Sequence, residues 1–258
     1  MAGAAQAIFP DLAGASVFVT GGGSGIGAAL VAGFAAQGAR VAFVDVLPSD
    51  TFAETVAART GHLPLSIPCD ITDTAALTAA MDRAAAAHGP LRVLVNNAAD
   101  DLRVSADEVT PAVWDKNLSL NLDAYFHTCR HAAPMMRGAG GGSIVNFSSI
   151  TCMMGMAGIV PYVTANAGII GMTRALAREW GGDLIRVNAV APGWVLTEKQ
   201  LRLWATEEAL AEFLPRQCLP VRIQPEDLVG PVLFLASAVS RVITGQVLPV
   251  DAGVVHGG

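Results

Sequence analysis

The chain has 258 residues, of which 52% are hydrophobic and 15% charged, and its formal net charge is −6. This length suffices for one large α/β domain with a substantial core. The acidic balance and the lack of a basic run argue against nucleic acid as a partner. The longest segment without a formal charge, residues 138–173, is interrupted by glycines and polar residues, so we expect no membrane span.

Other simple signals narrow the classes further. The first ten residues lack a basic region followed by an apolar core, so no signal peptide is predicted and a cytoplasmic location is expected. The four cysteines are scattered without a CxxC pair and are expected to be free, mostly buried thiols. The five histidines show no ligand spacing, so no metal site is predicted.

Short apolar runs alternate with longer Ala-rich segments of helical periodicity. Because the runs are continuously hydrophobic, they predict parallel strands buried on both faces. The alternation predicts a single Rossmann-type, doubly wound α/β domain over residues 1–258, with helices on both faces of a seven-stranded parallel sheet. The predicted strands are Ser16–Thr20, Val41–Val46, Leu63–Cys69, Leu91–Asn96, Ser143–Ser149, Leu184–Val190 and Gln246–Val250. The predicted helices include Ile26–Gln37, Ala75–His88, Pro111–Met136 and Tyr162–Trp180.

Residues 196–222 interrupt this alternation between the sixth strand and the last helix. The segment is rich in Leu, Trp and Glu. In a doubly wound fold an insertion there lies outside the carboxyl ends of the strands, where ligands bind. It is therefore predicted to be a substrate lid, the alternative being a plain surface helical hairpin.

A glycine-rich loop follows the first strand and opens a helix. Its spacing over residues 20–27 is T-G-x-x-x-G-x-G. Glycines allow a tight turn and a close approach to a pyrophosphate, whose charge the helix N-terminus favours. The residues expected to bind a dinucleotide here are Gly21, Ser24, Gly25, Ile26 and Gly27.

Asp45 ends the second strand, eighteen residues after Gly27. A carboxylate at this point can accept hydrogen bonds from both adenosine ribose hydroxyls and would repel a 2′-phosphate. The sequence thus predicts NAD rather than NADP as the cofactor. Arg40, which could favour NADP, stands before the strand and is too early to reach that site.

The last pattern is Ser149 followed thirteen residues later by Tyr162. With the glycine spacing, it resembles the short-chain dehydrogenase/reductase family, and the resemblance extends from Leu12 to Gly253. It implies that Ser149 holds the substrate oxygen, that Tyr162 is the general acid/base, and that Asn121 supports a proton-relay water. Residues 96–99 resemble the family N-N-A-G motif, with Ala99 in place of the last glycine. The further cofactor contacts that the resemblance implies are Asp70, Ile71, Asn97, Ala98, Tyr162, Asn166, Pro192, Gly193, Val195 and Thr197.

Asn166 departs from the family pattern, which has a lysine four residues after the tyrosine. That lysine binds the nicotinamide ribose and lowers the pKa of the tyrosine by charge proximity. Asn166 is neutral and offers only an amide. The sequence has two lysines: Lys116 projects from a different face of its helix than Asn121, and Lys199 could approach the site only if the lid folds inward.

Three explanations of Asn166 remain open. It can be a deliberate substitution that inactivates the enzyme, a natural residue in an enzyme that uses a relayed water, or the mark of a non-catalytic nucleotide-binding relative. The presence of Ser149, Tyr162 and Asn121 favours an enzyme whose tyrosine is left unactivated.

The chain also resembles, more finely, the bacterial sugar 1-dehydrogenases, which oxidise aldoses to lactones. This resemblance rests on residues 96–101, Arg103, residues 199–200, Trp204, and residues 217–220 and 222–227. A polyol needs many donors and acceptors and a flat apolar surface. Met153, Met154 and Met156 make one wall flexible, which leaves room for a cyclic alcohol, a hydroxysteroid or a 3-oxoacyl substrate. Alternatively, the two aspartates are solvated loop residues and Trp204 belongs to the core of the lid. The predicted substrate contacts are Asp100, Asp101, Arg103, Ser149, Met154, Tyr162, Gln200 and Trp204.

The predicted partner is therefore a small molecule, a monosaccharide first of all. The apolar helices 111–136 and 162–180 and the terminal strand match elements that this family uses between subunits. A homotetramer is expected by resemblance, with a dimer as the alternative.

Overall fold

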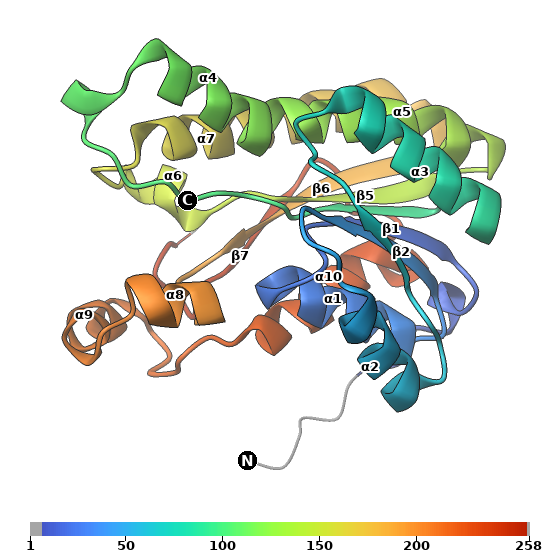
Figure 1. The fold of residues 1–258 in the computed structure, drawn as a ribbon, viewed down its shortest axis with the longest axis horizontal. Coiled ribbons are helices and arrows are strands. Elements are labelled where there is room, and N and C mark those ends of the chain that lie inside the picture. Colours follow the sequence, from blue (N-terminus) through green and yellow to red (C-terminus); the bar gives the residue numbers. More distant parts are fainter. Residues whose placement is uncertain (1–6, 257–258) are drawn as a thin grey trace.

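Seven strands form one parallel sheet in the computed structural model, which describes residues 7–256 (Figure 1). The ends of the expected domain, residues 1–6 and 257–258, lie outside the described residues, and so does most of the segment in which we looked for a signal peptide. The strand order is β3-β2-β1-β4-β5-β6-β7, and the predicted doubly wound sheet is confirmed. The strands are β1 Ser16–Thr20, β2 Arg40–Asp45, β3 Leu65–Pro68, β4 Val93–Asn96, β5 Gly142–Phe147, β6 Ile185–Pro192 and β7 Val247–Val250.

The strand order reverses at β1, which pairs with β2 on one side and with β4 on the other. The loops that leave these strands diverge at their carboxyl ends, and this switch point is where doubly wound sheets bind ligands. The glycine loop after β1, Asp45 at the end of β2 and residues 97–101 after β4 all lie there.

Helices cover both faces of the sheet (Figure 1). Alternate residues of β1 face opposite layers: Val17 and Val19 pack into a core with α1 and α10, and Phe18 packs into a second core with α3, α5 and α7. Every residue of β1 is buried, as expected of a strand covered on both sides. The helices are α1 Gly25–Ala36, α2 Asp50–Thr60, α3 Thr74–His88, α4 Pro111–Leu118, α5 Ala124–Gly138, α6 Ile150–Met154, α7 Val160–Trp180, α8 Glu198–Leu203, α9 Glu207–Phe213 and α10 Val229–Ala236.

The predicted helix Pro111–Met136 is interrupted by a π-helical turn over Ser119–Asp123. Asn121 lies in this turn, and its amide nitrogen donates to the main-chain oxygen of Asn117 at 3.0 Å. Such single turns occur often at functional sites. A hydrophobic pattern cannot reveal one extra residue in a turn, which is why the sequence predicts a regular helix here.

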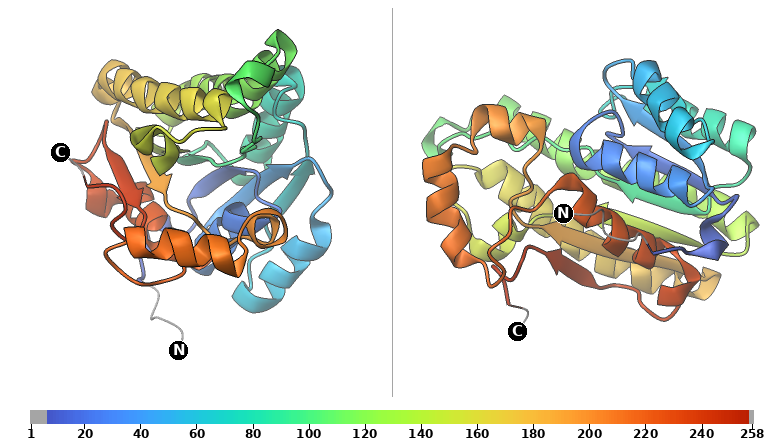
Figure 2. Two further views of the ribbon diagram at one scale, coloured as in Figure 1. Left: turned by 90° about the vertical axis from the view of Figure 1, so that its left-hand side faces the viewer. Right: turned by 90° about the horizontal axis from the view of Figure 1, so that it is seen from below.

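The predicted lid, residues 196–222, contains α8 and α9. Thr197 and Thr206 cap these helices by accepting hydrogen bonds from the main-chain N–H groups of Gln200 and Ala209, each at 3.2 Å. The two helices lie at one end of the molecule, near α6 (Figures 1 and 2). Within residues 7–256, no helix is both long enough and apolar enough to cross a bilayer.

Candidate active site

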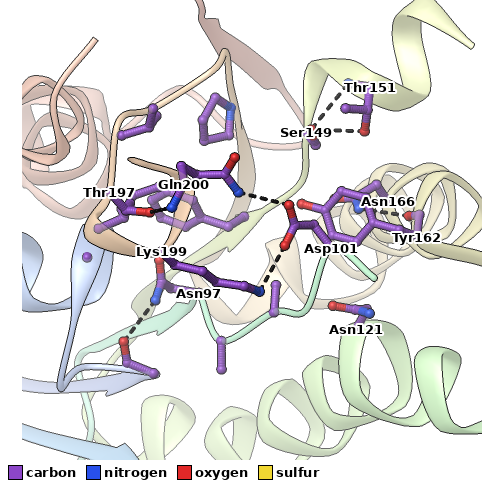
Figure 3. A pocket seen from close by; sticks show the side chains of 18 of the residues that line it. Asn97, Asp101, Asn121, Ser149, Thr151, Tyr162, Asn166, Thr197, Lys199 and Gln200 are labelled. Atoms are coloured by element: carbon purple, nitrogen blue, oxygen red, sulfur yellow. Dashed lines mark hydrogen bonds and ion pairs between the residues drawn. The ribbon is translucent and has the colours of Figure 1, made fainter. Parts of the chain in front are cut away.

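One cavity of about 1110 Å³ runs from the glycine loop to the lid. Its walls come from the ends of β1, β2, β4, β5 and β6, from the start of α7, and from α8 and α9. A volume of this size accommodates a large ligand and a smaller one side by side. The cavity unites the predicted nucleotide site with the predicted catalytic residues (Figure 3).

The glycine loop is held close to the loop after β4. Asn97 donates its side-chain amide to the main-chain oxygens of Thr20 and Gly21, both at 3.1 Å. A Cβ on Gly27 would stand 1.8 Å from the oxygen of Gly21, and one on Gly25 would stand 3.1 Å from Cγ2 of Thr197 across the cavity. A side chain at position 27 would collide with the turn itself, and one at position 25 would enter the space toward Thr197. The glycines therefore keep the loop compact and open, as a dinucleotide site needs.

The adenosine end of the cavity contains Asp45 and Ile71 but not Asp70. Asp45 lines the cavity and accepts a hydrogen bond from the N–H of Gly23 at 2.9 Å. Asp70 is not among the described residues that line the cavity. Its carboxylate instead accepts hydrogen bonds from the N–H and the hydroxyl of Thr72, at 2.9 and 2.7 Å. These two hydrogen bonds lower the pKa of Asp70. The other predicted cofactor residues that line the cavity are Gly21, Ser24, Gly25, Ile26, Gly27, Asn97, Ala98, Pro192, Gly193, Val195 and Thr197.

Ser149 and Tyr162 both face the cavity. Ser149 caps α6, and its Oγ accepts hydrogen bonds from the N–H and the hydroxyl of Thr151 at 3.2 and 3.0 Å. Tyr162 keeps part of its surface open to the cavity, yet burial, with a further contribution from Asp101, raises the pKa of its hydroxyl to about 12. At pH 7 only about 0.001% of such a hydroxyl would be ionised.

Asn166 is buried one helical turn after Tyr162. Its amide nitrogen donates to the main-chain oxygen of Tyr162 at 2.8 Å (Figure 3). The side chain therefore turns back onto its own helix and brings no charge to the cavity. A lysine at this position would place an ammonium there.

Asn121 is 1% exposed, and its amide groups bind main chain. Its Oδ1 accepts from the N–H of Asp100 at 2.9 Å, and its Nδ2 donates to the oxygen of Asp100 at 3.1 Å. The π-helical turn thus clamps the loop after β4. Asn121 also lines the cavity, and its part in a proton relay stays a prediction.

Helix α8 of the predicted lid contacts that loop. Lys199 donates to Oδ1 of Asp100 at 2.8 Å. It also donates to Oδ1 of Asp101 at 2.9 Å, while Gln200 donates to Oδ2 of Asp101 at 2.8 Å (Figure 3). Trp194 in turn donates its ring N–H to Oε1 of Gln200 at 3.0 Å. Burial alone would raise the pKa of Asp101, but the hydrogen bonds from Lys199 and Gln200 outweigh it, so the pKa is lowered. The hydrogen bonds to Asp100 and Asp101 in turn outweigh the burial of Lys199 and raise its pKa.

Trp204, the predicted apolar surface for a sugar, is not among the described residues that line the cavity. Its ring lies under the guanidinium of Arg103, 3.9 Å from the ring centroid, and Arg103 is the partner that lines the cavity. The apolar wall is formed instead by Trp194 and Phe213, whose rings meet edge to face at 5.2 Å. Asp100 also lies outside the lining, whereas the remaining predicted substrate contacts Asp101, Arg103, Met154 and Gln200 line the cavity.

Several lining residues escaped the sequence prediction of the site. Trp194 directly follows the predicted Pro192-Gly193 pair and could have been included on that ground. Phe213 and Arg216 carry no motif, because their position depends on how the lid folds. Arg216 approaches Sδ of Met154 at 3.5 Å and closes the wall beside Phe213.

Comparisons with known proteins agree with this geometry. A family model described as enoyl-(acyl carrier protein) reductase, within the short-chain dehydrogenase/reductases, matches residues 21–255. The chain therefore belongs to the short-chain dehydrogenase/reductase family, whose members are oxidoreductases that use NAD or NADP.

Three similar proteins illustrate the relationship. A probable galactose dehydrogenase of Rhizobium meliloti is 53% identical over 248 residues, which cover 95% of this chain and 97% of that protein. A D-xylose 1-dehydrogenase of Caulobacter vibrioides is 45% identical, with coverage of 96% and 98%. A solved structure from Beutenbergia cavernae, described as an NAD(P)-dependent gluconate 5-dehydrogenase with bound NADP at low occupancy, has 36% identity and a TM-score of 0.89 over 95% of this chain and 98% of that chain.

Proposed function

We propose that the chain oxidises a sugar hydroxyl, and specifically the C1 hydroxyl of an aldose, to give a lactone. The observation that carries this proposal is the single cavity in which Ser149 and Tyr162 face the same space as the glycine loop. The relatives described as galactose and D-xylose dehydrogenases support the sugar as substrate.

The roles of the chain's own residues follow from their chemistry. The Ser149 hydroxyl donates a hydrogen bond to the reacting oxygen, and Tyr162 takes its proton. Asp101 and Gln200 offer an acceptor and a donor to the other sugar hydroxyls, and the edge-to-face pair of Trp194 and Phe213 gives the sugar an apolar surface. The dinucleotide, when bound, accepts the hydride from the substrate carbon.

We propose NAD as the cofactor. Asp45 lines the cavity with a carboxylate that would repel a 2′-phosphate. Arg40, at the opposite end of β2, donates its Nε to the main-chain oxygen of Gly14 at 2.9 Å and supplies no charge near Asp45. Because the Beutenbergia cavernae protein has bound NADP, the choice of NAD by this chain needs a direct test.

We also propose that the chain as given turns over slowly, because Asn166 leaves Tyr162 protonated. Slow turnover is the expected behaviour both of an inactivating substitution and of a natural enzyme that uses a relayed water. It does distinguish both from a non-catalytic NAD-binding protein, which would gain nothing from a lysine at position 166.

The substrate is tested with a panel. NADH formation is measured with D-galactose, D-xylose and other aldoses, and with cyclic alcohols and a hydroxysteroid, for the chain and for its Asn166→Lys variant. The aldoses should give the highest kcat/KM in both proteins, with a lactone as product. Higher kcat/KM for the cyclic alcohols, or no aldose turnover even in the variant, would contradict the proposal.

A homotetramer in the cytoplasm is the proposed state of the protein. Phe126 on α5 and Val160 at the start of α7 are 42% and 39% exposed, on elements that the family uses between subunits. Light scattering on the purified chain would give the mass of four subunits, and a mass of one or two would contradict the proposal.

A further inference from the structure

The cavity gathers several charged groups around its one reactive tyrosine. Two of them, Asp101 and Lys199, belong to different parts of the chain and meet because α8 packs on the loop after β4. Tyr125, the other tyrosine of the chain, also lines the cavity and is 1% exposed. The charged residues that line the cavity are Asp45 at the adenosine end and Asp101, Arg103, Glu198, Lys199, Arg202 and Arg216 toward the lid.

Most of the arginines in this set are occupied elsewhere. Arg103 stacks on Trp204, and Arg216 lies 5.5 Å from the ring centroid of Phe213. Lys199 is different, because its ammonium is anchored at two points, 2.8 Å from Asp100 and 2.9 Å from Asp101. It is therefore a cation fixed beside Asp101, and both residues line the cavity that Tyr162 also lines.

The charges around Tyr162 act in opposite directions. Asp101 raises the pKa of Tyr162, and Lys199 lowers it. If Lys199 were neutral, the charge of Asp101 would oppose an ionised Tyr162 without compensation from Lys199. If Asp101 were neutral, more of the charge on Lys199 would act on Tyr162.

We propose that Lys199, held by Asp101, supplies the positive charge near Tyr162 that position 166 does not supply. Lys199 is a positioning residue in this scheme, since it acts on the proton of Tyr162 and not on the substrate. Because Lys199 belongs to the lid, its charge is present only while α8 lies against the loop after β4. Proton transfer at Tyr162 is thereby tied to a closed lid. Only the kinetic test of this role rests on the proposed oxidation of a sugar hydroxyl.

The first experiment needs no substrate. The chain has two tyrosines, and burial raises the pKa of Tyr125 well above its usual range, so the first ionisation seen in the ultraviolet absorbance of tyrosinate belongs to Tyr162. A Tyr162→Phe variant must abolish it, and circular dichroism at each pH checks that the chain stays folded. Asp101→Asn should shift this ionisation to lower pH, whereas Lys199→Met should shift it to higher pH or out of the accessible range.

The second experiment measures kcat for the best aldose against pH. Lys199→Met should lower kcat at pH 7 by about tenfold, which corresponds to one pKa unit, whereas Lys199→Arg, which keeps the charge, should stay within about twofold. Lys116→Met is the matched control, because the other lysine of the chain does not line the cavity, and it should leave kcat unchanged. A merely structural contact would change KM and leave the pH dependence of kcat as it was.

The two proposals fail in different ways. In the Asn166→Lys background, a fixed lysine already favours ionised Tyr162, so Lys199→Met should lower kcat by less than about threefold. If no aldose is oxidised even in this background, the proposed function fails, and the tyrosinate ionisation still decides the role of Lys199. If Lys199→Met and Lys116→Met give the same ionisation and the same kcat profile, the role of Lys199 is overturned, whatever the substrate.

Discussion

Asn166 donates its side-chain amide to the main-chain oxygen of Tyr162, four residues earlier in the same helix, at 2.8 Å. The side chain is thus used within α7 and leaves the tyrosine hydroxyl with no fixed cation from its own helix. Burial of Tyr162 and the charge of Asp101 raise the pKa of its hydroxyl, and the neutral amide of Asn166 opposes them only through a hydrogen bond.

Replacing Asn166 by lysine should therefore accelerate the reaction. We expect kcat at neutral pH to rise by about 10²–10⁴-fold, the usual contribution of a general acid/base. The sign follows from the pKa: Tyr162 must lose its proton to act as a base, so lowering its pKa from about 12 shifts the rise of kcat toward lower pH. NADH formation against pH measures this. Asn166→Gln, which is longer but neutral, should give no such shift, and equal rates for the lysine and glutamine variants would contradict the explanation.

Asp45 should determine the choice between the two dinucleotides. Asp45→Asn removes the charge that would repel a 2′-phosphate, so we expect the ratio of kcat/KM for NADP to that for NAD to rise by about tenfold or more. Initial rates at varied cofactor concentration measure it in the Asn166→Lys background, where turnover is fast. Arg40→Met is the control, because Arg40 is engaged with Gly14. A loss of NADP use in that control would mean that Arg40 reaches the cofactor after all.

Trp194 and Trp204 should differ in their effect on substrate binding. Trp194 lines the cavity and holds Gln200, so Trp194→Phe should raise KM for the aldose by about five- to tenfold through the loss of one hydrogen bond at the site. Trp204→Phe should change KM by less than about twofold, since Trp204 lies under Arg103 outside the lining. The reverse order of the two KM effects would restore Trp204 as the sugar platform.

Gly14 and Gly21 allow the cost of backbone strain to be measured apart from the cost of a steric contact. Gly14 and Gly21 have φ of +72° and +66°, so alanine at either position should cost about 1–2 kcal/mol of unfolding free energy. A Cβ on Gly14 meets nothing within 4 Å, whereas one on Gly21 stands 2.8 Å from Cα of Ala98 in the cofactor loop. Gly21→Ala should therefore lose additional stability, as measured by denaturant unfolding. It should also weaken dinucleotide binding, as measured by calorimetry. Equal losses in the two variants would show that the contact with Ala98 is unimportant.

Local rules were enough to predict most of the fold. Short continuous apolar runs bounded by glycine, such as Ser16–Thr20, are typical of strands covered on both faces. A glycine loop that follows such a strand and opens a helix is thereby placed at the end of that strand. Boundaries were less certain: Leu63 was expected in the third strand, but β3 begins at Leu65 and Leu63 is 66% exposed. The sixth strand extends beyond Val190 to Pro192 because it pairs with β7 as far as Val250.

What the sequence by itself determined about this protein is its fold class, its nucleotide loop and its one chemical anomaly, because each depends on residues close together in the chain. Only the tertiary structure decided what surrounds Tyr162. Asp101 and Lys199 are 98 residues apart in the chain and meet at 2.9 Å. Trp194 lines the cavity where Trp204 was expected, and Trp204 stacks on Arg103 instead. Such contacts depend on how α8 and α9 pack over the sheet, and no local pattern encodes the direction in which a lid closes.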